Sequence, residues 1–386
     1  MIVSTQPITD RSALSAEHAE VIKATLPLVG SKINEITPIF YKKMFAAHPE
    51  LIANTFNRGN QKQGDQQKAL AASIATFATM LVNPDAPDPV QLLSRIGHKH
   101  VSLGITADQY DIVHEHLFAA IVEVLGADTV TPPVAEAWDA VYWIMANVLI
   151  GFENSLYASN DLEPGDVFRE VTVTAKKQIS ATVWEYTLQG ELVSPEPGQY
   201  TSIGVKLDDG ARQLRQYSLL GGSETEYRIA VEDNGEVSGF LRDRVSVGDK
   251  IEATIAAGDL VLNKDTNPVV LISQGIGSTP MVGMLAGMNP ERDVVVLHAD
   301  QSESTYAQVE EVQGLVEKLP KAAFEIFYRD NDQWLEVAGR IPSGASVYLC
   351  GGVEFLKNVR GQIEALEEQP RDVNFELFSP NDWLIS

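Results

Sequence analysis

Helical spacing places one histidine of the N-terminal half on the apolar side of its helix. His100 follows Leu93 by seven positions and Ile96 by four, so it shares their face, whereas His98 lies on the polar face. An inward imidazole can be a metal ligand. It can also be an ordinary core residue satisfied by a hydrogen bond, and a lone inward histidine is more often of this second kind.

More polar side chains share the apolar faces of their helices, namely Tyr41, Gln66, Tyr110 and Glu153. Gln66, for example, is in phase with Leu70. Each has an ordinary alternative, since tyrosines are common in cores and Glu153 could cap an exposed edge. Together they predict a polar site in the interior of this half, because burying a polar group without a partner costs free energy.

The C-terminal half carries a motif suited to a flat, phosphorylated cofactor, Arg215-Gln216-Tyr217-Ser218. The arginine can pair with a phosphate, the ring of Tyr217 can lie against a ring system, and the Ser218 hydroxyl can bond a ring nitrogen. Farther on, Ser238 is a candidate N-cap for a helix over Gly239–Val245, where backbone amides suit a pyrophosphate. An ordinary strand and a simple capped turn are the alternatives.

A glycine-bearing turn follows an apolar strand and opens a predicted helix over Met281–Gly287; its sequence is Ser273-Gln274-Gly275-Ile276-Gly277-Ser278-Thr279-Pro280. Such a turn lets backbone amides approach a diphosphate, although the third glycine of the usual fingerprint is absent. Cys350-Gly351-Gly352 ends a later strand and would reach the same sheet edge. Asp300 follows the second strand, where an acid suits a ribose 2′-hydroxyl; this leans toward NADH without deciding between NADH and NADPH.

The elements that must position these residues change in character near residue 160. Before it, apolar residues recur at helical spacing, predicting helices over Ser31–Ala47, Gln61–Val82, Val90–Val101, Gln109–Leu125 and Val134–Ala158. Afterwards come short alternating segments, predicting an antiparallel barrel or sandwich, at Val167–Val173, Thr182–Leu188, Tyr200–Leu207, Tyr227–Val231 and Lys250–Ile255. From Pro268, continuous apolar runs predict a parallel α/β sheet. We therefore expect a multidomain chain with domains at 1–158, 159–265 and 266–386.

Composition excludes several classes of protein. The chain has 386 residues and a formal net charge of −24, which disfavours nucleic acid and anionic membrane as partners. Its single cysteine excludes an internal disulfide and cysteine-based metal clusters. No signal-peptide or membrane-spanning run is evident. We expect a cytoplasmic monomer that acts on small molecules.

The order of the C-terminal motifs resembles the ferredoxin–NADP reductase superfamily over residues 166–386. The resemblance implies FAD held by Arg215, Gln216, Tyr217 and Ser218, with its pyrophosphate near Val237 and Ser238 and with Tyr200 near the flavin. It implies a nicotinamide dinucleotide over Gly275, Ile276, Gly277, Ser278, Thr279 and Pro280. Phe378, within Leu377-Phe378-Ser379-Pro380, would cover the flavin; family members often have Cys at Leu377 and Gly at Ser379.

The helical half resembles a bacterial globin through Phe40-Tyr41, Phe56-Asn57, Gly64-Asp65-Gln66, Gly97-His98-Lys99-His100, Asp108-Gln109-Tyr110 and Ala146-Asn147-Val148. A globin followed by this reductase resembles the arrangement of the flavohaemoglobin family. The resemblance implies an all-α globin domain, then a β-barrel FAD domain, then an α/β NAD-binding domain. The resemblance implies haem b on His100, with Tyr110 and Glu153 behind it. It places Tyr41, Gln66, Phe56 and Leu70 in the distal pocket, and Lys99 and Glu376 where they tune redox potentials.

The activity that this resemblance implies is nitric oxide dioxygenation: electrons pass from NAD(P)H to FAD to haem, and nitric oxide is oxidised with dioxygen to nitrate. Tyr41 would donate a hydrogen bond to the dioxygen. Two alternatives stay open, a haem–flavin reductase of peroxides or other acceptors and a dioxygen sensor or store. The sequence also leaves open whether a lipid occupies the distal pocket.

Overall fold

The computed structural model describes residues 6–7, 9–58 and 65–378, and of residues 65–69 and 71–72 it describes the backbone only. The chain divides into two compact units. One contains the helices up to Val167 together with the hairpin tip Lys206–Leu214, and the other contains Phe168–Val205 and the described chain from Arg215 onward. Among the described helices, none is long and apolar enough to cross a membrane.

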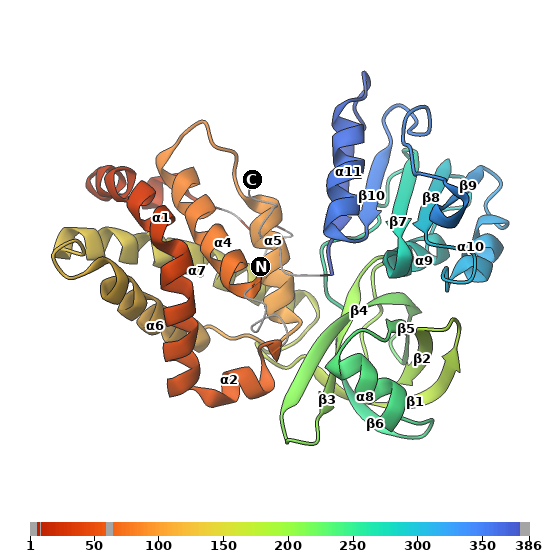
Figure 1. Ribbon diagram of the computed structural model, residues 1–386, viewed down its shortest axis with the longest axis horizontal. Coiled ribbons are helices and arrows are strands. Elements are labelled where there is room, and N and C mark those ends of the chain that lie inside the picture. Colours follow the sequence, from red (N-terminus) through yellow and green to blue (C-terminus); the bar gives the residue numbers. More distant parts are fainter. Residues whose placement is uncertain (1–5, 8, 59–64, 379–386) are drawn as a thin grey trace. The chain divides into compact units, whose positions relative to one another are not determined.

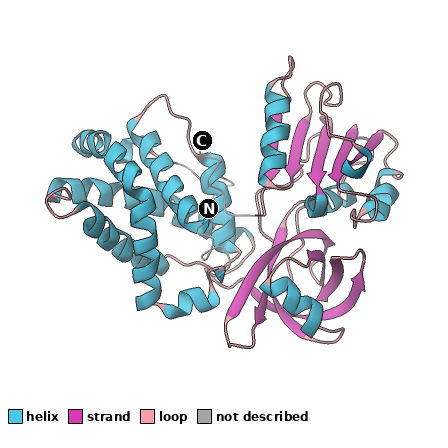
Figure 2. Cartoon of the chain, viewed as in Figure 1, coloured by secondary structure: helices cyan, strands magenta, loops and turns pink. Residues whose placement is uncertain are grey.

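The first unit is helical (Figures 1 and 2). Its elements are η1 (Arg11–Ala13), α1 (Ala16–Ala47), α2 (Pro49–Asn54), α4 (Asp65–Val82), α5 (Val90–Val101), α6 (Asp108–Leu125) and α7 (Pro132–Ser159). Helix α1 begins well before the predicted start at Ser31 and runs through Pro27 and Gly30. The Ser15 side chain caps its first turn, and burial of Ile22 and Val29 outweighs the hydrogen bond that Pro27 cannot make.

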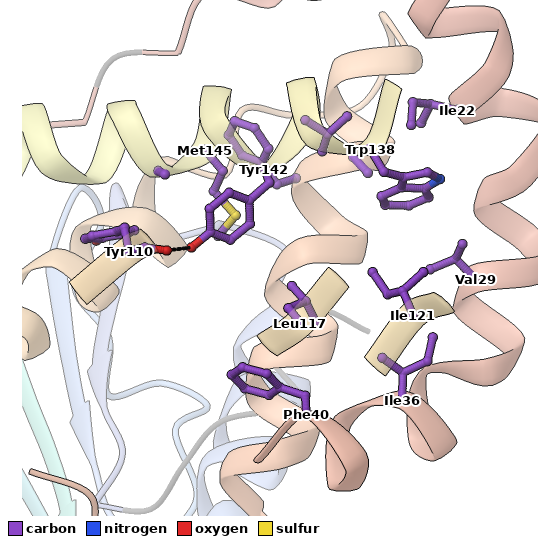
Figure 3. Close-up of a cluster of buried hydrophobic side chains, with 14 of the residues drawn as sticks. Ile22, Val29, Ile36, Phe40, Tyr110, Leu117, Ile121, Trp138, Tyr142 and Met145 are labelled. Carbon is purple, nitrogen blue, oxygen red and sulfur yellow. Dashed lines mark hydrogen bonds between the residues drawn. The ribbon is translucent and has the colours of Figure 1, made fainter. Parts of the chain in front are cut away.

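One apolar core joins the helices of this unit. Helix α1 packs against α4, α6 and α7, and α5 packs against α7. Figure 3 shows Ile36 and Phe40 of α1 facing Leu117 and Ile121 of α6. All four side chains are buried, so the predicted apolar faces of these helices do form the interior.

The second unit begins with an antiparallel barrel, as the alternating segments predict. Its elements are β1 (Phe168–Gln178), β2 (Val183–Gln189), β3 (Tyr200–Lys206), β4 (Arg212–Gly222), β5 (Glu226–Glu232), α8 (Glu236–Arg244) and β6 (Lys250–Thr254). The barrel closes in the order β1-β2-β5-β4-β3-β6. Closure leaves the barrel without an unpaired edge strand.

A parallel sheet follows, also as predicted. Its elements are β7 (Val269–Gln274), η2 (Gly275–Gly277), α9 (Ser278–Ala286), β8 (Val294–Asp300), α10 (Val309–Val316), β9 (Ala322–Tyr328), η3 (Arg329–Asn331), β10 (Ser346–Cys350), α11 (Val353–Glu364) and β11 (Asp372–Glu376). The strand order is β11-β10-β7-β8-β9 with parallel neighbours. The sequence pattern did not predict β9 and β11, because both are edge strands with partly exposed faces and lack a continuous apolar run.

Two glycines allow the barrel and the sheet to pack closely inside the second unit. Gly198 has φ +106°, and a Cβ there would lie 2.1 Å from the carbonyl oxygen of Leu260. A Cβ on Gly283 of α9 would lie 2.4 Å from the carbonyl oxygen of Leu219 in β4. A side chain at Gly198 would collide with the Leu260 backbone, and one at Gly283 would push α9 away from the barrel. The division of the chain at 158/159 and 265/266 remains a prediction.

Candidate functional site

In the helical unit, His100 belongs to a three-residue network whose other two members, Tyr110 and Glu153, are buried. His100 Nδ1 lies 2.7 Å from Glu153 Oε1 and 3.0 Å from Tyr110 Oη. Tyr110 Oη donates to the same Glu153 oxygen at 2.6 Å. The three residues come from α5, α6 and α7, and each lies on the helix face that the sequence predicts.

Close helix packing brings these residues together. A Cβ on Gly97 of α5 would lie 2.5 Å from Cδ1 of Phe152, so only glycine lets α5 approach α7 this closely. One residue beyond Phe152 stands Glu153, and one turn beyond Gly97 stands His100. Tyr142 of α7 donates to the backbone carbonyl of Tyr110 at 2.6 Å, which ties α6 to α7 (Figure 3).

The electrostatics leave one imidazole nitrogen for a ligand. Burial raises the pKa of Tyr110 and the Glu153 charge raises it further, so the phenol stays protonated and donates. The Glu153 side chain is 3% exposed, whereas that of His100 is 31% exposed. Within the described chain the hydrogen bonds of His100 to Tyr110 and Glu153 both go through Nδ1, so they do not occupy Nε2.

This donor set fits haem rather than a bare metal ion. Among the described residues no group of three or more His, Cys, Asp or Glu side chains could hold a metal ion. A single imidazole fixed by a carboxylate at its other nitrogen would instead be suited to hold the iron of a haem.

Two of the predicted distal residues, Tyr41 and Phe56, belong to one aromatic cluster. Tyr41 is buried in α1, with its ring centroid 5.6 Å from that of Phe45 and 5.9 Å from that of Phe56. Phe56 and Leu70 are partly buried against the same core as Tyr41. The side chain of Gln66 lies outside the described residues.

In the barrel, the arginine–tyrosine motif lies on β4. Arg215 and Tyr217 are two positions apart and share one face of the strand. Burial raises the pKa of Tyr217 while the Arg215 charge opposes the rise, so the two groups lie within electrostatic range of each other. Gln216 Nε2 donates to the Ser202 hydroxyl of β3 at 3.0 Å, and the neighbouring Ser218 is buried.

Tyr200, at the start of β3, packs against the loop after β6. Its backbone forms a bridge with Ala257. A Cβ on Gly258 would lie 2.9 Å from the Tyr200 ring. The glycine thus gives this predicted flavin neighbour room on one side.

The prediction that Ser238 is an N-cap is wrong. Helix α8 begins at Glu236, so Ser238 is its third residue and Gly235 is the N-cap. The Ser238 hydroxyl accepts from the Gly235 amide at 2.9 Å, which is the reciprocal half of a capping box. A pyrophosphate would therefore meet backbone amides here, because the Ser238 hydroxyl is committed and Val237 is buried.

The two glycines of the glycine-bearing turn, the predicted diphosphate site, each have a structural reason. Gly275 has φ +54°, and a Cβ on Gly277 would lie 2.5 Å from the Cys350 carbonyl oxygen. Cys350 of β10 pairs with Ser273 of β7, so both loops do reach one sheet edge. Helix α9 starts at Ser278, three residues earlier than predicted.

Two hydroxyls of this turn are already bonded within the protein. Ser278 Oγ donates to Gln308 Oε1 at 2.6 Å, and Thr279 Oγ1 donates to the Ile276 carbonyl at 2.9 Å. Pro280 is buried, as are both hydroxyl residues. A dinucleotide would accordingly meet backbone amides of the turn more than these side chains.

The C-terminal residues follow the edge strand β11. Glu376 is the last residue of β11 and pairs with Cys350. Leu377 is buried and Phe378 is 50% exposed. Ser379 and Pro380 lie outside the described residues. Lys99 is exposed on α5.

Some residues of these sites were missed from sequence. Gln308 and Ser202 contact the predicted residues only through folding of distant segments. His298 lies in β8 between Ser273 and Asp300, bonded to both. The sequence offered one signal for His298, which directly follows the apolar run Val294–Leu297.

A helical unit with a carboxylate-fixed histidine, followed by a closed barrel and a parallel sheet with a glycine turn, defines a haem–flavin oxidoreductase. The globin family model matches residues 39–149. A flavohemoprotein of Deinococcus radiodurans is 37% identical and covers 95% of this chain and 98% of its own length. The chain belongs to the flavohaemoprotein family.

Solved structures agree with this assignment. A flavohemoglobin of Malassezia yamatoensis with bound FAD and heme has a TM-score of 0.88 at 33% identity, covering 95% of this chain and 100% of its own. The flavohem-like FAD/NAD binding domain of a nitric oxide dioxygenase from Vibrio cholerae has a TM-score of 0.52 at 31% identity. It covers 55% of this chain and 99% of its own.

Proposed function

We propose that the chain is a nitric oxide dioxygenase that converts nitric oxide and dioxygen to nitrate with electrons from NAD(P)H. The observation that carries the proposal is the network of His100, Tyr110 and Glu153. A buried carboxylate bonded to the imidazole strengthens the electron donation of a ligating histidine. Strong donation suits iron that activates dioxygen, whereas simple storage of dioxygen does not require it.

When bound, haem would supply iron for dioxygen chemistry, and FAD would accept a hydride and release electrons singly. His100 would hold the iron through Nε2 while Glu153 fixes the ring by accepting from Nδ1–H. Tyr110 keeps Glu153 in place by donating to its Oε1 atom. On the distal side Tyr41 and Gln66 would donate hydrogen bonds to the oxygen substrate, with Phe56 and Leu70 as apolar walls.

In the second unit, Arg215 would pair with a FAD phosphate, while Tyr217, Tyr200 and Phe378 would lie against the flavin ring. Gln216 supports this strand from behind through Ser202, and Ser218 would bond a flavin nitrogen. The amides near Val237 and Ser238 would receive the FAD pyrophosphate. The turn from Gly275 to Pro280 would receive the nicotinamide dinucleotide, with Lys99 and Glu376 tuning the potentials of the two cofactors.

The test is nitric oxide consumption by the purified holoprotein with NADH, with and without dioxygen. We expect rapid consumption only with dioxygen, one nitrate formed per nitric oxide, and a strong loss of rate in Tyr41→Phe. Slow consumption with no nitrate would refute the proposal. Rapid turnover of peroxides instead would favour a haem–flavin peroxide reductase.

A further inference from the structure

A buried chain of hydrogen bonds runs from the glycine-bearing turn to the end of β8. Ser273 Oγ lies 2.8 Å from His298 Nδ1, and His298 Nε2 lies 3.2 Å from Asp300 Oδ2. The His298 ring is buried and stacks on Tyr306, with the ring centroids 3.6 Å apart. Only Asp300 among them has a role predicted from sequence, as a partner for a ribose 2′-hydroxyl, and the proposed function uses neither Ser273 nor His298.

The chemistry of the partners fixes the tautomer of His298. Burial lowers the pKa of His298 although Asp300 opposes the change, so the ring is neutral and carries one N–H. A carboxylate can only accept, so the proton sits on Nε2 and points to Asp300. Nδ1 is then the acceptor for the Ser273 hydroxyl. Every polar atom of the ring is committed, and the ring cannot turn.

Asp300 is held as a charged group with one acceptor position to spare. Burial raises its pKa, but hydrogen bonds from His298, Thr305 and the Gln301 amide outweigh that effect and lower it. Thr305 and Gln301 both bond Oδ1, and His298 bonds Oδ2. A carboxylate offers about four acceptor positions, so one remains on Oδ2. The side chain is 7% exposed, so it is not completely closed to a ligand.

The surroundings of Asp300 are acidic. Asp300 ends β8, one strand away from the turn after β7, at the sheet edge where dinucleotides bind in such folds. Glu232 of β5 lies near enough for Asp300 to raise its pKa, in addition to the larger effect of burial. Burial is the main cause of the raised pKa of Tyr328, and the charges of Glu303 and Asp300 raise it further. The nearby Arg329 lies over the Trp334 ring at 5.1 Å. The three carboxylates of Glu232, Asp300 and Glu303 outnumber the single charge of Arg329, so their combined charge would repel a phosphate.

We propose that His298 is a positioning residue for the choice of dinucleotide. It holds the Asp300 carboxylate so that its remaining acceptor position takes a ribose 2′-hydroxyl and rejects a 2′-phosphate. The inference rests on the proposed function, because it requires the glycine-bearing turn to bind a nicotinamide dinucleotide. Ser273 and Tyr306 orient His298, and Thr305 supports Asp300 from the other side.

Two substitutions of His298 separate positioning from simple packing. His298→Asn can still accept from Ser273 but is too short to reach Asp300, whereas the longer amide of His298→Gln can donate to Asp300. In FAD-loaded full-length protein we would measure the Kd of NAD⁺ and NADP⁺ and the kcat/KM of flavin reduction by NADH and NADPH. We expect Asp300→Asn and His298→Asn to lower the preference for the unphosphorylated nucleotide by about tenfold, the value of one charge-assisted bond. His298→Gln should restore most of it.

Controls lie in the same loop. Thr305→Val removes a donor to Asp300 from an exposed position and should lower the preference even if His298→Asn fails to fold. Ser304→Ala, which touches Ser302 rather than Asp300, should leave the preference unchanged. Equal losses for both nucleotides in His298→Asn, or an unchanged ratio in Asp300→Asn or Thr305→Val, would overturn the inference while leaving dinucleotide binding intact. Wild-type protein whose flavin neither nucleotide reduces would overturn the proposed function itself.

Discussion

Glu153→Gln isolates the effect of one buried charge on the haem that we place at His100. Glu153 Oε1 accepts from His100 at 2.7 Å and from Tyr110 at 2.6 Å. The amide keeps the shape and an acceptor but removes the charge, which weakens each bond from the charge-assisted to the neutral range, by about 1.4 kcal/mol. The carboxylate stabilises ferric iron more than ferrous iron. Its loss should therefore raise the midpoint potential by about 60 mV for this one-electron couple.

Tyr110→Phe should move the potential in the opposite direction. Tyr110 and His100 donate to the same oxygen of Glu153, so removing the phenol leaves that oxygen a stronger acceptor for the imidazole. Spectroelectrochemical titration of the haem band measures both shifts, with the exposed Glu115→Gln as the matched control in α6. A potential that stays the same or falls in Glu153→Gln would refute the role of Glu153 behind the haem ligand.

Three further predictions follow from the described contacts. Tyr41→Phe should release dioxygen at least about tenfold faster, because it loses one hydrogen bond to a polar ligand. Stopped-flow displacement measures the release rate, and an unchanged rate argues against Tyr41 as the donor. Gly277→Ala should lower the kcat/KM for NADH with haem and FAD content unchanged, because the new Cβ would lie 2.5 Å from the Cys350 carbonyl oxygen; normal NADH kinetics would exclude the turn as the site. Burial lowers the pKa of His298 below its ordinary 6.5, so below that pH the unfolded chain binds a proton that the folded chain does not. The free energy of unfolding should then fall with decreasing pH by up to about 1.4 kcal/mol per pH unit. Thermal unfolding from pH 7 to about pH 5 measures this slope, and His298→Gln should flatten it. An unchanged slope would contradict a buried, neutral His298.

Helical phase predicted the interior position of His100, and it did so because α5 is strongly amphipathic with regular spacing. It also placed Tyr110 and Glu153 on inward faces. Phase could not show that the three side chains meet, because their contact depends on the close approach of α5 and α7 at Gly97. The haem was predicted only from the resemblance to globins.

In the second unit the apolar runs predicted the central strands, which are buried on both faces. The edge strands β9 and β11 were not predicted, because exposure on one side allows polar residues such as Glu325 within the strand. Ser238 was placed at the wrong helix position, since a serine at the third residue of a capping box looks the same in sequence as an N-cap. The partners Ser202 and Gln308 follow from tertiary contacts that no local pattern encodes.

The most direct test of the account is the absorption spectrum of His100→Ala during reduction by NADH. If His100 holds the haem and the second unit delivers electrons independently, the variant will lose the haem band while its FAD is reduced at the wild-type rate. An unchanged haem spectrum in His100→Ala would contradict the account, because the iron would then be held by another residue.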